Sequence, residues 1–247
     1  MIPKIIHYCW FGNSEKSKSI TEYIESWKKI LPDYDFMEWN ESNFDVENSI
    51  PYVKEAYAEK KYAFVSDYVR LYALKTYGGI YLDTDVEIVK PFEELLENYS
   101  VVTGFETLQT LITAFIACEK DNDIITTFFS RYETLKFVKD DGSYDMTPIN
   151  NRFTDLMVEY GLAINNEKQV LHNDTVLIFP YETFTGYDIE NSHPKVTENT
   201  YTIHHFQSSW KKLSLKEFVE YKIIVPIVQK IIGYDRYDAL KKKLKGN

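Results

Sequence analysis

The feature that most constrains the fold of this chain is a long helical pattern followed directly by a glycine pair and a short apolar strand. The stretch from Ala63 to Tyr77 predicts a helix, because its apolar residues recur at helical spacing. Gly78 and Gly79 end that helix by supplying a left-handed cap. Ile80 to Leu82 predicts a buried strand that begins at once. Because helices and strands alternate through the first half of the chain, we expect an α/β fold.

The same patterns predict the remaining elements and a single domain. Helices are expected over residues 19–30, 52–59, 92–98, 123–134 and 148–160 and from 215 onward. Strands are expected over residues 5–11, 34–39, 86–89, 101–105, 176–179 and 200–206, while the type of the apolar stretch 112–118 stays open. No repeat, low-complexity linker or composition break divides the chain. We therefore expect one domain over residues 1–247, with a helical, basic C-terminal segment at 214–247.

Composition limits the partners and the compartment. The 247 residues are 44% hydrophobic and 16% aromatic, which is typical of a globular core, and the net charge of −10 disfavours nucleic acid. Two cysteines, Cys9 and Cys118, fit reduced thiols. The N-terminus lacks the apolar core of a signal peptide, and no apolar run is long enough to span a membrane. We expect a cytoplasmic protein, with peripheral contact at the inner membrane face through the basic C-terminal segment as an alternative.

Two aspartates follow the apolar strand, one residue apart. If the strand geometry persists, Asp83 and Asp85 point to the same face and place two carboxylates side by side. A divalent cation would neutralise them and keep coordination sites free for phosphate oxygens, which suggests a metal–diphosphate site of a nucleotide-sugar enzyme. Two other interpretations remain open on this motif alone. Aspartates also terminate strands by bonding backbone amides, and a phosphohydrolase can use the first aspartate as its nucleophile.

A charged pair lies inside the otherwise apolar helix that precedes this motif. Asp67 and Arg70 are three residues apart and therefore share a face of the helix. Burying an unpaired charge is costly, so the two are expected to pair with each other. Without further context, this pattern favours a structural ion pair.

The order of these pieces resembles glycosyltransferase family 32. That group includes mannosyl- and galactosyltransferases and capsular polysaccharide enzymes, and it is related to the catalytic core of large glucosylating toxins. The resemblance rests on Trp10 at a strand end, on the residues 63–70, on the run 77–85 and on the late segment 204–210. It implies a GT-A fold, in which a mixed central sheet is flanked by helices, and transfer with retention of anomeric configuration.

The resemblance also implies roles for residues around the donor sugar and its diphosphate. Asp67 matches an aspartate that contacts the donor sugar, and Arg70 matches an arginine that holds the sugar and the diphosphate region. The fixed donor fork of arginine suits that task. Ser208 and Trp210 match the Ser-x-Trp end of the segment whose hydroxyl and indole reach the metal and the diphosphate. We place Asp67, Arg70 and Trp210 among the catalytic residues.

Two aromatic residues are expected on the nucleoside side. Trp10 resembles the residue that stacks on the donor base, although a core tryptophan is the alternative. Tyr81 matches a tyrosine near the ribose or the phosphate. With Ser208, Asp67 and Arg70, they make up the expected donor-binding residues.

The metal ligands implied by the resemblance are Asp83, Asp85 and a late histidine. Asp83 corresponds to the aspartate that touches the ribose and the water shell of the metal, and Asp85 to a direct ligand; both are also taken as catalytic. We take His205 as the third ligand, with His204 as the alternative, and a histidine that only bonds backbone also stays open. An imidazole ligand would favour Mn²⁺ over Mg²⁺.

The expected function is therefore a retaining, metal-dependent hexosyltransferase. A UDP-sugar is the favoured donor and GDP-mannose the alternative, and the acceptor would be a glycan or a lipid-linked saccharide in surface polysaccharide synthesis. Thr113 stands where relatives often have an asparagine, and the residues 145–150 match the family only loosely, which leaves the sugar pocket undefined. Glu106 is a candidate for binding sugar or acceptor hydroxyls, and His7 is expected to be structural. The alternatives are a haloacid-dehalogenase-like phosphohydrolase and a non-catalytic homologue that binds a nucleotide or sugar.

Overall fold

The computed structural model describes residues 1–188, 193–207, 233 and 236. Ser208 and Trp210 therefore lie outside the described residues. So does the basic segment 214–247, with the helix predicted from residue 215, apart from Gly233 and Arg236. Within those described ranges, none of the helices has the length and apolar character needed to cross a membrane. The prediction that the whole chain is one domain stays a prediction.

A mixed seven-stranded sheet forms the centre of the fold, with strands in the order β2-β1-β3-β6-β5-β8-β7. Their bounds are β1 Ile5–Cys9, β2 Asp35–Trp39, β3 Gly79–Leu82, β5 Val101–Gly104, β6 Phe115–Cys118, β7 Gln169–Leu171 and β8 Val176–Phe179. Strand β1 pairs in parallel with both β2 and β3, while β6 runs antiparallel to β3 and to β5. The predicted mixed central sheet flanked by helices is confirmed.

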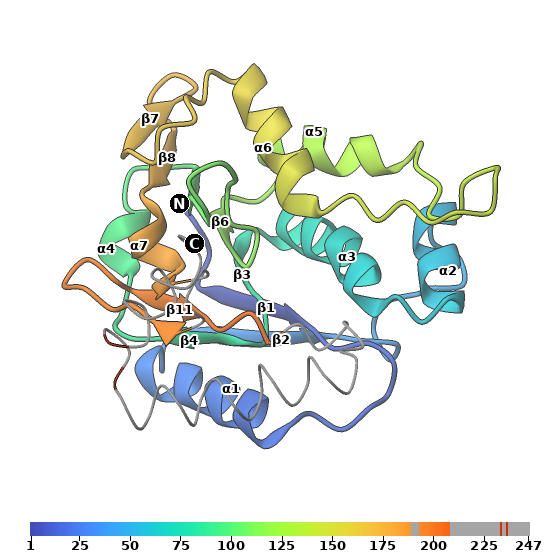
Figure 1. Ribbon diagram of the computed structural model, residues 1–247, viewed down its shortest axis with the longest axis horizontal. Coiled ribbons are helices and arrows are strands. Elements are labelled where there is room, and N and C mark those ends of the chain that lie inside the picture. The colour runs from blue at the N-terminus through green and yellow to red at the C-terminus, as the bar shows by residue number, and fades with distance from the viewer. Residues whose placement is uncertain (189–192, 208–232, 234–235, 237–247) are drawn as a thin grey trace.

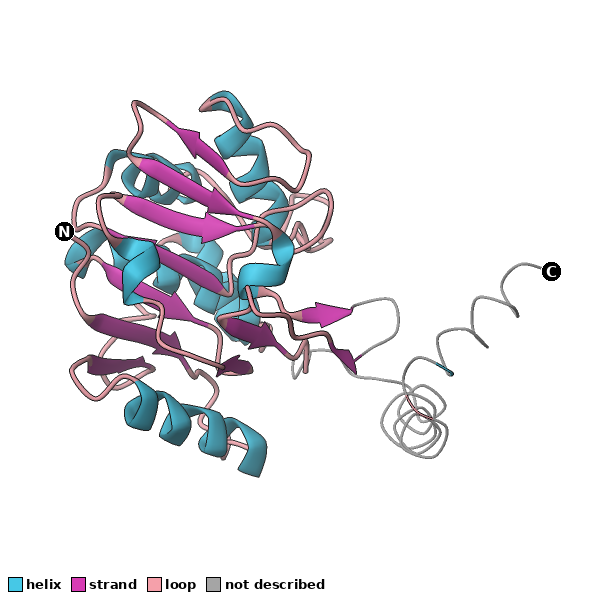
Figure 2. Cartoon of the chain, turned by 90° about the vertical axis from the view of Figure 1, so that its left-hand side faces the viewer, coloured by secondary structure: helices cyan, strands magenta, loops and turns pink. Residues whose placement is uncertain are grey.

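Helices cover both faces of this sheet, as Figures 1 and 2 show. Their bounds are α1 Lys18–Ile30, α2 Pro51–Ala58, α3 Tyr62–Tyr77, α4 Glu93–Leu96, α5 Asp123–Tyr132, α6 Ile149–Glu159 and α7 Tyr181–Phe184. Alternate residues of β3 enter different cores, because successive side chains of a strand point to opposite faces. Ile80 and Leu82 pack in the cluster that contains Trp27 of α1, whereas Tyr81 packs in the cluster of α3 and α5.

A small two-stranded sheet extends the central strand beyond the aspartate motif. Strand β4 (Val86–Ile88) pairs antiparallel with β11 (Thr202–His204), and Val86 lies opposite His204. The indole nitrogen of Trp27 donates a hydrogen bond of 2.8 Å to the carbonyl oxygen of Val86, which ties β4 to α1. Late residues of the chain therefore lie beside the end of β3, where Figure 1 shows β11 next to β4.

The glycine pair at the junction of α3 and β3 is required by its surroundings. Gly78 has φ +67° and ψ −166°, so it adopts the extended positive-φ region that is essentially limited to glycine, rather than the expected left-handed cap. Gly79 has φ +101°, and a Cβ there would lie 2.6 Å from the carbonyl oxygen of Ile5. The pair lets α3 turn into β3 directly against β1.

Most predicted elements are present with ends shifted by a few residues. The open stretch 112–118 contains a strand, β6, over its second half. The structure adds the edge strand β7, the short helix α7 and the two-residue strands β9 (Tyr187–Asp188) and β10 (His193–Pro194), none of which was predicted. These short pieces carry little periodicity, so pattern recognition has nothing to detect.

Candidate active site

The two aspartates lie on a turn between β3 and β4. The amide of Val86 donates a hydrogen bond of 3.0 Å to the carbonyl oxygen of Asp83, which closes the turn. The condition that strand geometry persists through Asp85 is therefore not met. The amide of Asp83 still bonds the carbonyl oxygen of Ala114 at 3.1 Å, so the turn begins at the edge of β6. The turn, rather than strand alternation, brings the two carboxylates to one place.

Arg70 contacts both Asp67, its partner on α3, and the turn that carries Asp83. Its Nη2 lies 3.1 Å from Oδ1 of Asp67 and 3.3 Å from Oδ1 of Asp83. Its Nη1 donates a hydrogen bond of 2.7 Å to the carbonyl oxygen of Thr113, and the guanidinium lies 4.4 Å from the ring centroid of Tyr81. The Tyr81 hydroxyl in turn donates to Oδ1 of Asp83 at 3.0 Å. The predicted Asp67–Arg70 pair forms, and Arg70 also contacts the motif.

Burial sets the protonation of this group. Arg70 is only 5% exposed, and burial works to lower its pKa, but Asp83, Tyr81 and Asp67 outweigh that effect and raise the pKa above its usual value. The guanidinium therefore stays charged. Burial also raises the pKa of Asp67 to about 7, although Arg70 acts in the opposite direction. The pKa of Asp83 is likewise raised, mainly by burial.

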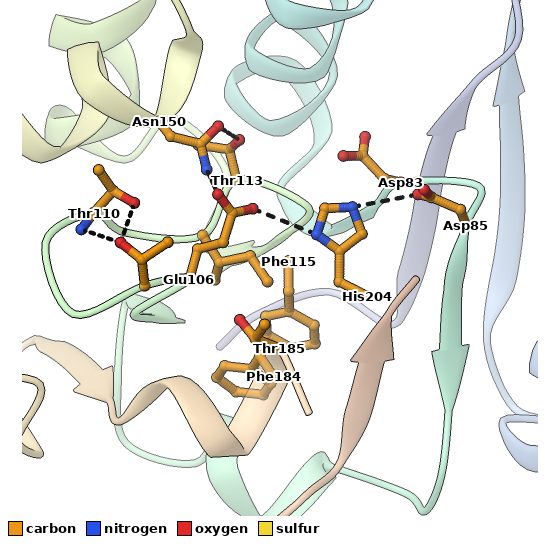
Figure 3. A network of polar contacts seen from close by, with 12 residues as sticks. Asp83, Asp85, Glu106, Thr110, Thr113, Phe115, Asn150, Phe184, Thr185 and His204 are labelled. Carbon is orange, nitrogen blue, oxygen red and sulfur yellow. Dashed lines mark hydrogen bonds and ion pairs between the residues drawn. The ribbon is translucent and has the colours of Figure 1, made fainter. Parts of the chain in front are cut away.

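His204 lies between the turn and the loop that follows β5. Its Nε2 is 3.4 Å from Oδ1 of Asp85, and its Nδ1 is 3.4 Å from Oε1 of Glu106 (Figure 3). Burial works to lower the pKa of His204, but Asp85 and Glu106 outweigh it and raise this pKa to about 10. The pKa of Asp85 is lowered, because His204 and the backbone amide of Gln207 outweigh the effect of burial. The two carboxylates therefore favour the charged form of the His204 imidazole.

His205, the predicted third metal ligand, faces the other way. Its Nε2 lies 2.8 Å from Oε2 of Glu87, and its ring stacks on Tyr23 of α1 with centroids 4.9 Å apart. Ligand atoms of Asp83, Asp85 and His204, by contrast, all lie within 4.8 Å of one another. Neighbouring residues at the end of β11 point to opposite sides, so only one of the two histidines can face the aspartates. The geometry corrects the choice from His205 to His204.

The segment after β11 engages Asp85 through its backbone. The amide of Gln207 donates a hydrogen bond of 2.8 Å to Oδ2 of Asp85, and the amide of His205 bonds the carbonyl oxygen of Asp85 at 3.1 Å. The side chain of Gln207 contacts Oγ of Ser19 at the start of α1. These contacts leave Oδ1 of Asp85 facing His204.

This donor set fits a divalent cation. Two carboxylates and an imidazole offer the mixture of oxygen and nitrogen ligands that suits Mn²⁺ better than Mg²⁺. Among the residues that the structure describes, the buried Nδ1 of His204 has no partner within ordinary hydrogen-bond geometry, and Oε1 of Glu106 lies 3.4 Å from it. A neutral histidine that donates from Nδ1 would present the lone pair of Nε2 toward the aspartates.

The site opens into a cleft of about 600 Å³. Trp10 lies on its wall, half-buried, and its indole nitrogen donates a hydrogen bond of 2.7 Å to the carbonyl oxygen of Ser14. The residues on its wall include several expected from the sequence, namely Asp67, Arg70, Tyr81, Asp83, Asp85 and Glu106. The expected donor-binding residues within the described ranges therefore surround one cavity. The roles assigned to them stay predictions.

Asn150 is a site residue that the sequence reasoning did not single out. Its Nδ2 donates to Oε2 of Glu106 at 2.9 Å, and its Oδ1 accepts from Oγ1 of Thr113 at 3.1 Å. Asn150 lies in the first turn of α6 and lines the cleft. The sequence did indicate this region, because residues 145–150 match the family only loosely. The threonine at position 113, where relatives often have an asparagine, indicates the same part of the cleft, because Thr113 and Asn150 are in contact.

Comparison with known proteins finds a family model that matches part of the chain. A family model described as "Glycosyltransferase sugar-binding region containing DXD motif" matches residues 17–102. The chain is 27% identical over 180 residues to Subversion of eukaryotic traffic protein A of Legionella pneumophila, covering 59% of this chain. It is 33% identical to Inositol phosphoceramide mannosyltransferase 3 of Schizosaccharomyces pombe over 38% of this chain. The chain spans 27% of the length of each of these relatives.

A solved structure titled "PaToxG Glycosyltransferase" is also similar. Its alignment has a TM-score of 0.48 and 23% identity, and it covers 64% of this chain and 69% of that one.

Proposed function

We propose, from the premise that this chain belongs to the glycosyltransferases with a DXD sugar-binding region, that it moves a hexose from a nucleotide-sugar to a saccharide acceptor. The observation that carries the proposal is the meeting of Asp83, Asp85 and His204 in the cleft, with Arg70 bound to Asp83. A UDP-sugar is the favoured donor and GDP-mannose the alternative. Transfer would retain the anomeric configuration, as the family resemblance implies.

Asp85 and His204 would hold a divalent cation, Mn²⁺ before Mg²⁺, with Asp83 beside them. A cation bound there would neutralise the charge that develops on the leaving diphosphate. Oδ1 of Asp85 is suited to a single bond to a cation, because Oδ2 already accepts from the amide of Gln207. Oδ1 of Asp83 accepts from Tyr81 and contacts Arg70, which suits a residue that touches the ribose or water more than a direct ligand.

Arg70 would stabilise negative charge on the donor. Its guanidinium is held by Asp67, by Asp83 and by the carbonyl oxygen of Thr113, so little reorganisation is needed when the donor binds. The buried ion pair with Asp67 fixes the direction of the fork. In this proposal Asp67 contacts the sugar, Tyr81 lies near the ribose, and Trp10 stacks on the base at the cleft wall.

The acceptor is proposed from the resemblance, as a glycan or a lipid-linked saccharide in surface polysaccharide synthesis. We also propose membrane contact through the basic segment 214–247, of which only Gly233 and Arg236 are described. The roles of Ser208 and Trp210 at the diphosphate are proposals on residues outside the described ranges.

The phosphohydrolase alternative fits the geometry less well. It needs Asp83 as a nucleophile, but Oδ1 of Asp83 accepts a hydrogen bond from Tyr81 and lies 3.3 Å from Arg70. These contacts withdraw electron density from the carboxylate and limit its approach to a phosphate ester. A non-catalytic homologue would keep the same cleft and would bind a nucleotide without turnover.

The test begins with the donor, because no acceptor needs to be known. UDP-, GDP- and CDP-sugars are screened with Mn²⁺ by thermal shift, and the stabilising donor is then assayed for hydrolysis. We expect Asp85→Ala to abolish the Mn²⁺-dependent hydrolysis, while Gln109→Ala, on the exposed loop after β5, retains it. Metal-dependent turnover in Asp85→Ala would show that the proposed metal site is wrong. Tight binding without hydrolysis or transfer would support the non-catalytic homologue, and release of phosphate from an aryl phosphate would support the phosphohydrolase.

A further inference from the structure

We propose that Glu106 is a positioning residue, whose carboxylate orients the imidazole of His204 so that Nε2 faces the metal site. The inference rests on the proposed function, which places a divalent cation beside Asp85 and His204. It gives Glu106 a task that differs from the binding of sugar hydroxyls.

The imidazole is held between two carboxylates. Figure 3 shows the ring of His204 with Asp85 on its Nε2 side and Glu106 on its Nδ1 side. Each of these nitrogens lies 3.4 Å from the nearest carboxylate oxygen. In a neutral imidazole one nitrogen carries the proton and the other carries the lone pair. A carboxylate that accepts the proton of Nδ1 therefore leaves Nε2 as the metal ligand.

Glu106 is itself held so that one oxygen is directed at His204. Its Oε2 accepts a hydrogen bond of 2.9 Å from Nδ2 of Asn150, which leaves Oε1 for the imidazole. Nδ2 of Asn150 also donates to the carbonyl oxygen of Leu111 at 2.9 Å, and its Oδ1 accepts from Thr113. The amide of Asn150 thus has three partners that fix its orientation, and Glu106 is fixed with it.

His204 is buried, so the orientation of its imidazole depends on the groups around it. The residue is only 8% exposed, and the ring of Phe206 lies 4.0 Å from the imidazole, centroid to centroid. The side chain of Glu106 is 14% exposed. A buried N–H without an acceptor is destabilising, so removal of the Glu106 carboxylate would favour turning the ring or moving the proton to Nε2. Either change removes the lone pair from the metal site.

Metal selectivity separates this role from a merely structural one. Losing the carboxylate partner of a ligating histidine typically weakens metal affinity by about 10–100-fold. Imidazole contributes more to binding of Mn²⁺ than of Mg²⁺, because Mg²⁺ prefers oxygen ligands. If His204 is misoriented, affinity for Mn²⁺ falls more than affinity for Mg²⁺. General damage to the cleft would lower the two affinities alike.

The experiment titrates the full chain with Mn²⁺ alone, followed by electron paramagnetic resonance, and obtains Mg²⁺ affinity by competition. We expect Glu106→Ala to weaken Mn²⁺ binding by about 10–100-fold and to lower the Mn²⁺/Mg²⁺ affinity ratio, as His204→Ala does. Glu106→Gln keeps an acceptor for Nδ1 and should lose less. In the His204→Ala background, Glu106→Ala should add almost nothing, because both changes act through the same ligand. Gln109→Ala, three residues away, is the matched control and should bind Mn²⁺ like the unaltered chain.

The outcomes separate the inference from the proposed function. If Asp85→Ala weakens Mn²⁺ binding but Glu106→Ala leaves the affinity ratio unchanged, the positioning role is wrong and the metal site stands. A raised KM for the donor, with Mn²⁺ affinity unchanged, would then assign Glu106 to sugar hydroxyls. If the unaltered chain shows no Asp85-dependent Mn²⁺ binding, the proposed metal site and the inference fail together. If Glu106→Ala does not fold, Glu106→Gln and Asn150→Ala decide by the same affinity ratio.

Discussion

The two carboxylate oxygens of Asp85 contact two residues of one late segment of the chain, His204 and Gln207. Oδ2 accepts the amide of Gln207, while Oδ1 faces Nε2 of His204. The same few residues therefore bind the motif through the backbone and through a side chain. The sequence motif predicted a pair of carboxylates, but the structure shows that Asp83 is engaged by Arg70 and Tyr81 and that Asp85 is the better placed ligand.

Replacing His204 should weaken Mn²⁺ binding, whereas replacing its neighbour His205 should not. His204→Ala removes the imidazole beside Asp85, so we expect Mn²⁺ affinity to fall by more than about tenfold. His205→Ala removes contacts with Glu87, Tyr23 and Tyr187, which lie away from the aspartates, so Mn²⁺ affinity should stay close to that of the unaltered chain. Calorimetric titration with Mn²⁺ measures both. Equal losses in the two variants, or a larger loss in His205→Ala, would contradict the assignment.

At the scale of elements, the junction of α3 and β3 places the donor-binding groups. Helix α3 carries Asp67 and Arg70, and β3 ends at the turn that carries Asp83, so a rigid junction keeps the three groups in register. The sequence predicted this junction well, because the helix period, the glycine pair and the apolar strand are strong local signals. The sequence did not predict the turn at the aspartates, because that turn depends on a distant contact. The amide of Asp83 bonds the carbonyl oxygen of Ala114, which lies between β5 and β6.

Gly79→Ala should disrupt this junction. The substituted residue would keep φ near +101°, which costs about 1–2 kcal/mol for any L side chain. Its Cβ would also lie 2.6 Å from the carbonyl oxygen of Ile5, so β3 would have to move away from β1. We expect a loss of unfolding free energy in urea that is clearly larger than the backbone cost, together with reduced donor binding.

Gly161→Ala is the matched control for that change. Gly161 has a similar φ of +93°, but a Cβ there has no atom within 4 Å. It should therefore show the backbone cost alone and leave donor binding unchanged. If the two variants lose equal stability, close packing of β3 on β1 does not limit residue 79.

At the scale of the whole molecule, His7 joins three parts of the sheet. Its Nε2 lies 2.8 Å from the carbonyl oxygen of Gly78, and its Nδ1 lies 3.2 Å from the indole nitrogen of Trp39, which donates to it. The prediction that His7 is structural is confirmed. Burial lowers its pKa from 6.5 to about 4, since the imidazolium would have to leave water and Nδ1 is already an acceptor.

This lowered pKa predicts a pH dependence of stability. Above pH 6.5, His7 is neutral in both the folded and the unfolded states and contributes no penalty. As the pH falls toward 4, His7 binds a proton in the unfolded chain but not in the folded chain. The free energy of unfolding therefore decreases, by about 2 kcal/mol at pH 5. The measurement compares urea unfolding of the unaltered chain and His7→Gln between pH 7.5 and 5.

The difference between these two proteins isolates His7. The raised pKa of Asp67 acts in the opposite direction, because the folded state then binds a proton that the unfolded state lacks. That effect is common to both proteins and cancels. If the stability gap between the two proteins is the same at pH 7.5 and at pH 5, the histidine titrates normally in the folded state.

The sequence alone determined the parts of this protein that depend on near neighbours. The spacing of Asp67 and Arg70 on one helix face, the glycine pair, and the two aspartates after an apolar strand are all local patterns, and each survives in the structure. The family model that matches residues 17–102 spans these same positions.

Only the tertiary structure decided which distant residues complete the site. The antiparallel pairing of β11 with β4 sets His204 opposite Val86 and so turns His204, and not His205, toward Asp85. The packing of α6 brings Asn150 to Glu106. Register and packing depend on the whole sheet, and a shift of one residue reverses every side chain of a strand, so no local pattern could have made that choice.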